Sequence, residues 1–158
     1  MRKIAVLALV LLLLALFAAP VSAQVEQPEV TMTGSGQLML PPPPAYVEAN
    51  VTVHLDTATG KFRLTQIFPG GIMLFPGVRA IGNYAVGEVT YWEVDGNSVS
   101  VDILFDGYFL LTGQPPVLFV EDFAFHIEGL VTGPGNRGQI TFPDIGTIPA
   151  TIVIYAER

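Results

Sequence analysis

Apolar and polar side chains alternate with a period of two residues along most of this chain, and this alternation constrains the fold more than any other feature. It is clearest over residues 46–55, where one parity holds Val47, Ala49, Val51, Val53 and Leu55. Successive side chains of a β-strand point to opposite faces, so the pattern predicts a strand with one buried face and one solvated face. Beyond residue 23, no window of ten residues has helical apolar spacing without an interrupting Gly or Pro.

The N-terminal segment differs from the rest of the chain. Arg2 and Lys3 precede an unbroken apolar run over residues 4–19, and Pro20 and small residues follow as far as Ala23. This order is typical of a secretory signal peptide that is cleaved after Ala23. An uncleaved membrane anchor is the alternative, but the apolar run is short and Pro20 breaks the helix just before the small residues. We therefore expect a secreted or periplasmic/extracellular protein.

Turn residues divide the remaining sequence into about eight or nine strands. Asp95-Gly96-Asn97 predicts a tight hairpin turn, and Asp106-Gly107 predicts a second turn. Short connections favour neighbouring antiparallel strands. We therefore expect a signal helix at 1–23, a short polar lead at 24–29, and a single all-β domain at 30–158. The domain is predicted to be an antiparallel β-sandwich or β-barrel, and the pattern does not distinguish the two.

The apolar segment Ile72–Phe75 is bracketed by Gly and Pro. Four residues are too few for a helix. The segment is predicted to form either a short strand or an apolar loop that folds over the open end of the barrel or sandwich.

Charge and cysteine content exclude several classes of function. Without Arg2 and Lys3 the chain has five basic and fourteen acidic residues, so its formal charge is 5 − 14 = −9. Nucleic-acid binding requires clustered cations, and anionic membranes repel an acidic protein, so we expect neither partner after cleavage of the leader. The absence of cysteine excludes thiol catalysis, disulfides and thiolate metal sites.

Residues for catalysis or metal binding are sparse. His126 shares a strand face with Asp122 and Glu128, a spacing that suits one bound ion or acid–base chemistry, but a solvated polar face on an exposed strand is the favoured explanation. A zinc site that used both His126 and His54 would require their strands to be neighbours. We expect no catalytic residue, no metal site and no cofactor, and hence no enzyme.

Two acidic residues interrupt apolar parities, which indicates either a β-bulge, the favoured account, or an internal cavity. Glu88 lies on the parity of Val86 and Trp92, and Glu121 lies between Phe119 and Phe123. A carboxylate that faces a core must find a partner or meet water in a cavity, unless a bulge displaces it. The cavity hypothesis predicts a site for a small amphipathic ligand. Its candidate ligand-binding residues are Tyr84, Glu88, Trp92, Phe119, Glu121 and Phe123.

The first functional hypothesis is a secreted, non-enzymatic β domain that binds a small apolar or amphipathic ligand or a surface partner. The alternative is a structural or adhesive module of the cell envelope, which would contact an envelope or extracellular protein through a sheet edge or Ile72–Phe75. A hydrolase with a carboxylate pair, such as Glu88 with Glu121, is a third hypothesis. Asn50-Val51-Thr52 fits the acceptor pattern for N-glycosylation, and the sequence leaves ligand and oligomeric state open.

Overall fold

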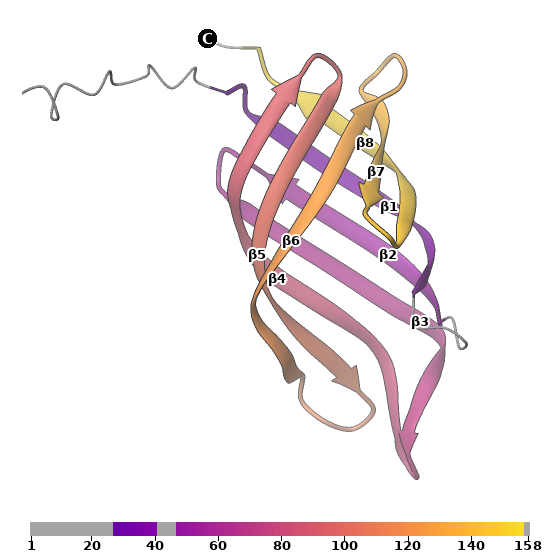
Figure 1. Ribbon diagram of the computed structural model, residues 1–158. Coiled ribbons are helices and arrows are strands. Elements are labelled where there is room, and N and C mark those ends of the chain that lie inside the picture. The colour runs from indigo at the N-terminus through magenta and orange to yellow at the C-terminus, as the bar shows by residue number, and fades with distance from the viewer. Residues whose placement is uncertain (1–26, 41–46, 157–158) are drawn as a thin grey trace, which may run out of the picture.

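The computed structural model describes residues 27–40 and 47–156 as a closed, all-antiparallel β-barrel in which each strand pairs with the next in sequence (Figure 1). Its strands are β1 (Val30–Leu40), β2 (Val47–Asp56), β3 (Lys61–Phe75), β4 (Val78–Asp95), β5 (Ser98–Leu111), β6 (Val117–Val131), β7 (Arg137–Phe142) and β8 (Gly146–Ile154). Pairing of β1 with β8 closes the ring. The predicted all-β fold and the antiparallel pairing of strands that follow each other in sequence are confirmed. Of the two predicted architectures, sandwich and barrel, the structure has the barrel. The predicted signal helix and its cleavage site lie outside the described residues.

The inward parity of the strands forms a continuous apolar core. In β2, Ala49, Val51, Val53 and Leu55 are all buried and the intervening residues are exposed. Gly34 of β1 faces inward as well, and a Cβ there would lie 3.1 Å from the side chains of Ile140 and Ile148. The missing side chain therefore allows β1 to approach the β7–β8 hairpin closely. Among the described residues, no helix is long and apolar enough to span a membrane.

The two ends of the barrel differ. We call the end that carries the turns at 57–60, 96–97 and 132–136 the closed end, and the end that carries the turns at 76–77, 112–116 and 143–145 the open end. At the closed end the buried Thr57 accepts a hydrogen bond from Val30 N at 2.7 Å, and Trp92 Nε1 donates to Pro28 O at 3.0 Å. At the open end the β3–β4 and β5–β6 hairpins project beyond the rest of the barrel (Figure 1).

The wall is incomplete toward the open end. β6 pairs with β5 over almost its whole length, but it pairs with β7 only from Glu128 to Val131. Within the described part of the chain, residues 117–127 therefore have no ladder partner on the side away from β5. On this side of β6 the wall is therefore held by side-chain contacts and not by a hydrogen-bonded ladder; for example, the rings of Phe125 and Phe142 stack across the gap.

Two local predictions have different outcomes. Asp106-Gly107 is not a turn, because β5 runs through it; the predicted turn is wrong. Gly107 is buried instead, and a Cβ there would lie 2.8 Å from the Phe119 ring. The missing side chain therefore allows the Phe119 ring of β6 to pack directly against the backbone of β5. Ile72–Phe75 continues β3 as a strand and ends at a Pro76-Gly77 turn with a φ of +82° at Gly77, which confirms the strand alternative.

Candidate functional site

A cavity of about 280 Å³ occupies the open end of the barrel. Strands β1 and β3 to β7 and the β7–β8 turn contribute its walls. The lining residues are Leu38, Phe62, Leu64, Gln66, Asn83, Tyr84, Ala85, Phe105, Phe119, Phe123, Phe125, Phe142 and Ile145. The volume is near the lower end of typical ligand pockets, about 300–1,000 Å³, and therefore suits a small molecule.

Phenylalanine rings dominate the wall. Phe105 lies at the centre of the cluster, with ring centroids 6.0 Å from Phe62, 5.5 Å from Phe123 and 6.3 Å from Phe125. Phe142 extends the cluster from the other side of the gap, 6.4 Å from Phe125. Stacked, tilted and edge-on rings at these distances form a continuous apolar surface, which favours flat or aromatic ligands.

The polar groups of the wall are uncharged. Gln66 of β3 and Asn83 of β4 are direct cross-strand partners, both half-buried, and both lie on inward parities. Each amide supplies one acceptor and two donors. The described lining contains no Asp, Glu, Lys, Arg or His. A ligand there would meet an apolar wall with one polar region, so the site favours a neutral molecule over an ion.

The structure brings three of the six predicted ligand-binding residues to this cavity. Phe119 and Phe123 of β6 line it, and each is about half exposed. Tyr84 also borders the cavity, but its ring stacks on that of Tyr108, with centroids 4.9 Å apart, on the parity opposite to Asn83 and Ala85. Tyr84 therefore supports the wall from its outer side.

Glu88, Trp92 and Glu121 lie elsewhere, and β-bulges explain why. The β4–β5 register shifts between Val89 and Tyr91, so Glu88 faces outward with Val86, whereas Trp92 faces inward at the closed end. A second shift leaves Glu121 and Asp122 unmatched in β6, with Asp122 at a φ of +50°, and Glu121 is exposed. Neither carboxylate needs a buried partner, and the Glu88–Glu121 pair is not assembled in the cavity.

Sequence reasoning missed Gln66 and Asn83. Gln66 carried a usable signal, because it lies on the parity of Phe62 and Leu64 and so interrupts an inward apolar series. Asn83 carried none, because both parities around it contain apolar residues. Only the cross-strand register joins the two amides into one polar region.

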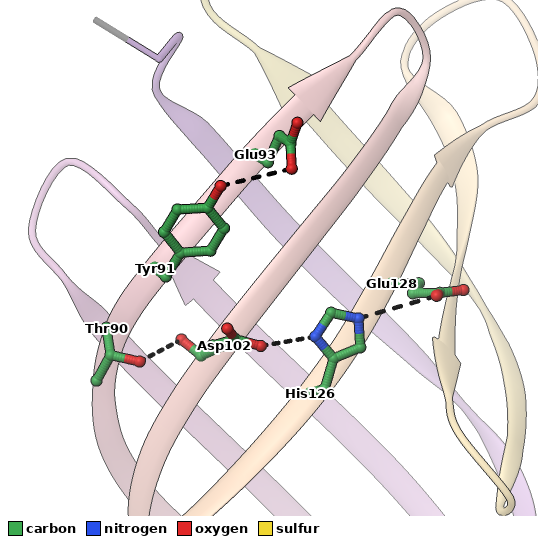
Figure 2. Close-up of polar contacts among 6 residues, drawn as sticks. All are labelled: Thr90, Tyr91, Glu93, Asp102, His126 and Glu128. Atoms are coloured by element: carbon green, nitrogen blue, oxygen red, sulfur yellow. Dashed lines mark hydrogen bonds and ion pairs between the residues drawn. The ribbon is translucent and has the colours of Figure 1, made fainter. Parts of the chain in front are cut away.

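A polar cluster lies on the outer face of β4, β5 and β6 (Figure 2). His126 Nδ1 is 2.7 Å from Asp102 Oδ1, and His126 Nε2 is 3.8 Å from Glu128 Oε1. Tyr91 Oη donates to Glu93 Oε2 at 3.5 Å. The His126, Asp102 and Glu128 side chains are about half exposed, as expected for a solvated surface network.

The ion-binding arrangements that the sequence left open, but that we did not expect, are not assembled in this cluster. The backbone N of Asp122 donates to Asp106 Oδ1 at 3.0 Å, away from His126. His54 lies on β2, where its Nδ1 is 3.1 Å from Thr33 Oγ1 of β1. Since β2 is not a neighbour of β6, His54 and His126 do not lie on adjacent strands. Within residues 27–40 and 47–156, no group of three or more His, Asp or Glu side chains is placed to hold a metal ion.

The His126 cluster is thus an exposed network on a strand face, whereas the cavity is a concave space lined mainly by apolar side chains. The cavity is therefore the stronger candidate for a functional site. Comparisons of this chain with protein-family models, with curated proteins and with solved structures found no match.

Proposed function

We propose that this chain is a non-enzymatic β-barrel, exported by its N-terminal segment, that binds a small neutral apolar or amphipathic molecule in the cavity at its open end. The observation that carries the proposal is the composition of the cavity wall: six phenylalanines and two facing amides, Gln66 and Asn83, with no charged group among the described lining residues. Apolar walls with a few convergent polar groups are typical of small-molecule sites.

The chemistry of the wall supports binding over catalysis. The described lining offers amides and one phenol, but no carboxylate, imidazole or serine that would serve as acid, base or nucleophile. The carboxylates of Glu88 and Glu121, which a hydrolase would need, are both exposed. The ligand would be held by ring contacts and oriented by the amide pair.

A pair of matched probes tests this proposal. We expect 2-naphthol, a neutral bicyclic alcohol, to bind, and 2-naphthalenesulfonate, which has the same rings and a negative charge, to bind at least about tenfold more weakly because burying its charge in this wall is costly. Isothermal titration calorimetry measures both affinities. Equal binding of the two probes, or no binding of 2-naphthol, would contradict the proposal.

Two variants locate the binding. Phe123→Glu places a charge in the cavity wall at a half-exposed position, and we expect it to weaken 2-naphthol binding at least about tenfold. Phe75→Glu makes the same change at an exposed phenylalanine outside the cavity and should leave the affinity unchanged. Identical effects of the two variants would place the probe outside the cavity.

A structural or adhesive module of the cell envelope is the second candidate function. It is favoured by the exposure of Met73, Leu74 and Phe75 at the tip of the β3–β4 hairpin. In this case we expect no binding of 2-naphthol. We also expect the parent protein to fractionate with the cell envelope of its native host and the Phe75→Glu variant to be lost from that fraction. Binding of 2-naphthol together with unchanged fractionation of Phe75→Glu would exclude this candidate.

A further inference from the structure

Charge is distributed unevenly between the two ends of the barrel. Residues 64–87, which include the β3–β4 hairpin, contain one charged residue, Arg79, and residues 107–120, which include the β5–β6 turn, contain none. All fourteen acidic residues lie outside these two segments. Hence the net charge of the chain, which argues against contact with membranes, does not describe these two hairpins, although the exposed Asp144 lies in the β7–β8 turn at the same end.

Charged residues of β3, β5 and β6 lie at one level, with the uncharged Val86 of β4 between them. Arg63 of β3 is the cross-strand partner of Val86, and Val86 is the partner of Asp106 in β5. Asp106 in turn accepts a hydrogen bond from Asp122 N in β6. We call Arg63, Asp106, Glu121 and Asp122 the charged belt. On the side toward the hairpin tips, the stacked rings of Tyr84 and Tyr108 follow the belt directly.

Large apolar side chains are exposed beyond the belt. Met73 and Phe75 of the β3–β4 hairpin are 59% and 61% exposed, and Leu118 of the β5–β6 hairpin is 46% exposed. The two hairpins project from the same end (Figure 1). Arg79, the single charge, packs its aliphatic stem against Gly71, and no acidic side chain of the described residues lies within ion-pair distance of it.

The order of these groups matches the profile of a bilayer surface. Charged side chains remain in water, tyrosines favour the headgroup region, and apolar side chains enter the acyl boundary. An arginine with a packed stem can extend its guanidinium to a lipid phosphate. Two separate hairpin tips form no flat face for a protein partner, whereas fluid lipid adapts to both.

We propose that the open end of the barrel docks onto a zwitterionic lipid bilayer. The tips of the β3–β4 and β5–β6 hairpins enter the interface, and the charged belt stays at the water boundary. This orientation brings the cavity, which Phe119 and Asn83 line at the same end, close to the lipid. The proposal rests on the surface of the barrel and stands whether or not the cavity takes a ligand.

Co-flotation of the purified protein with phosphatidylcholine vesicles tests the docking. We expect the protein to float, and the Met73→Glu/Phe75→Glu variant and the Leu118→Glu variant each to lower the partition coefficient at least about tenfold, because a carboxylate enters the apolar boundary poorly. Leu130→Glu, at an exposed leucine on the closed end, is the matched control and should float like the parent protein. Mass spectrometry of the N-terminus establishes whether the apolar run at 4–19, which would itself bind lipid, is present.

Fluorescence gives a second readout that is independent of stability. The sole tryptophan of the chain, Trp92, lies at the closed end. Because that end stays away from the lipid in the proposed orientation, tryptophan emission of the parent protein should not change when vesicles are added. Phe75→Trp should add a component that shifts to the blue with phosphatidylcholine vesicles, and phosphatidylglycerol in the vesicles should weaken binding by the acidic protein.

Failure of the protein to float, or equal partition of tip variants and parent, would overturn the proposal. So would self-association in the absence of lipid that the tip substitutions abolish, because a second copy would then be the occupant of this end.

Discussion

Gly87 of β4 lies close to the backbone of the neighbouring strand β5. A Cβ at this position would overlap the carbonyl oxygen of Leu104 and lie 2.6 Å from Phe105 Cβ. We expect Gly87→Ala to lower the free energy of unfolding by about 1–3 kcal/mol, because backbone must shift to admit the methyl group. Gly70→Ala is the control, since no atom lies within 4 Å of the added carbon. Urea denaturation measures both, and equal midpoints would show that β4 and β5 can separate without cost.

Phe62 combines two roles, because it is a core residue and a wall residue of the cavity. It is 2% exposed, and its ring packs against Phe105. Phe62→Ala should reduce the free energy of unfolding by about 3–5 kcal/mol, through lost burial and an enlarged cavity. Phe75→Ala, at an exposed position, should change it by less than about 0.5 kcal/mol. Thermal unfolding of the two variants compares them directly, and similar melting temperatures would contradict this packing.

At the scale of the strand, regular alternation could be predicted from sequence and bulges could not. β1 and β2 pair without a register shift, so their inward residues follow from the period of two alone. In β4 the shift at Thr90 places Trp92 inward and Glu88 outward, although the two share a parity. A bulge depends on how two strands pair, and this information is not contained in either strand alone.

The same reasoning explains the mixed outcome for the candidate site. Phe119 and Phe123 were predicted from their parity in β6, and they do line the cavity. Glu121 lies between them in the sequence but is exposed, because the irregular segment around Asp122 displaces it. The amide pair of Gln66 and Asn83 requires the β3–β4 register, which shifts between Ile67 and Ile72 and which the hairpin sequence does not specify.

The side of β6 away from β5 is a free strand edge over residues 117–127 of the described chain. Free strand edges template association, and bulges and charges protect against it. Glu121 and Asp122 provide both in the middle of this edge. We expect Glu121→Thr to increase self-association in sedimentation velocity experiments at high concentration. Asp102→Thr removes one exposed charge from β5, which pairs on both sides, and should remain at the parent level. Equal behaviour of both variants would mean that net charge, and not the edge, controls association.

For the molecule as a whole, the two ends should differ in local stability. Val99, Val101 and Ile103 of β5 are buried and paired on both sides toward the closed end, whereas the hairpin tips have little burial and neighbours on one side only. Opening of a tip exposes little apolar surface, while opening of the closed end disrupts the core. Amide hydrogen exchange should therefore give the highest protection at residues 99–103 and the lowest at residues 73–78 and 112–118. Added phosphatidylcholine vesicles should slow exchange at the two tips and leave residues 99–103 unchanged. Uniform protection along β3 and β4 would show that the barrel opens as a single cooperative unit, and that its open end has no independent mobility with which to enter lipid.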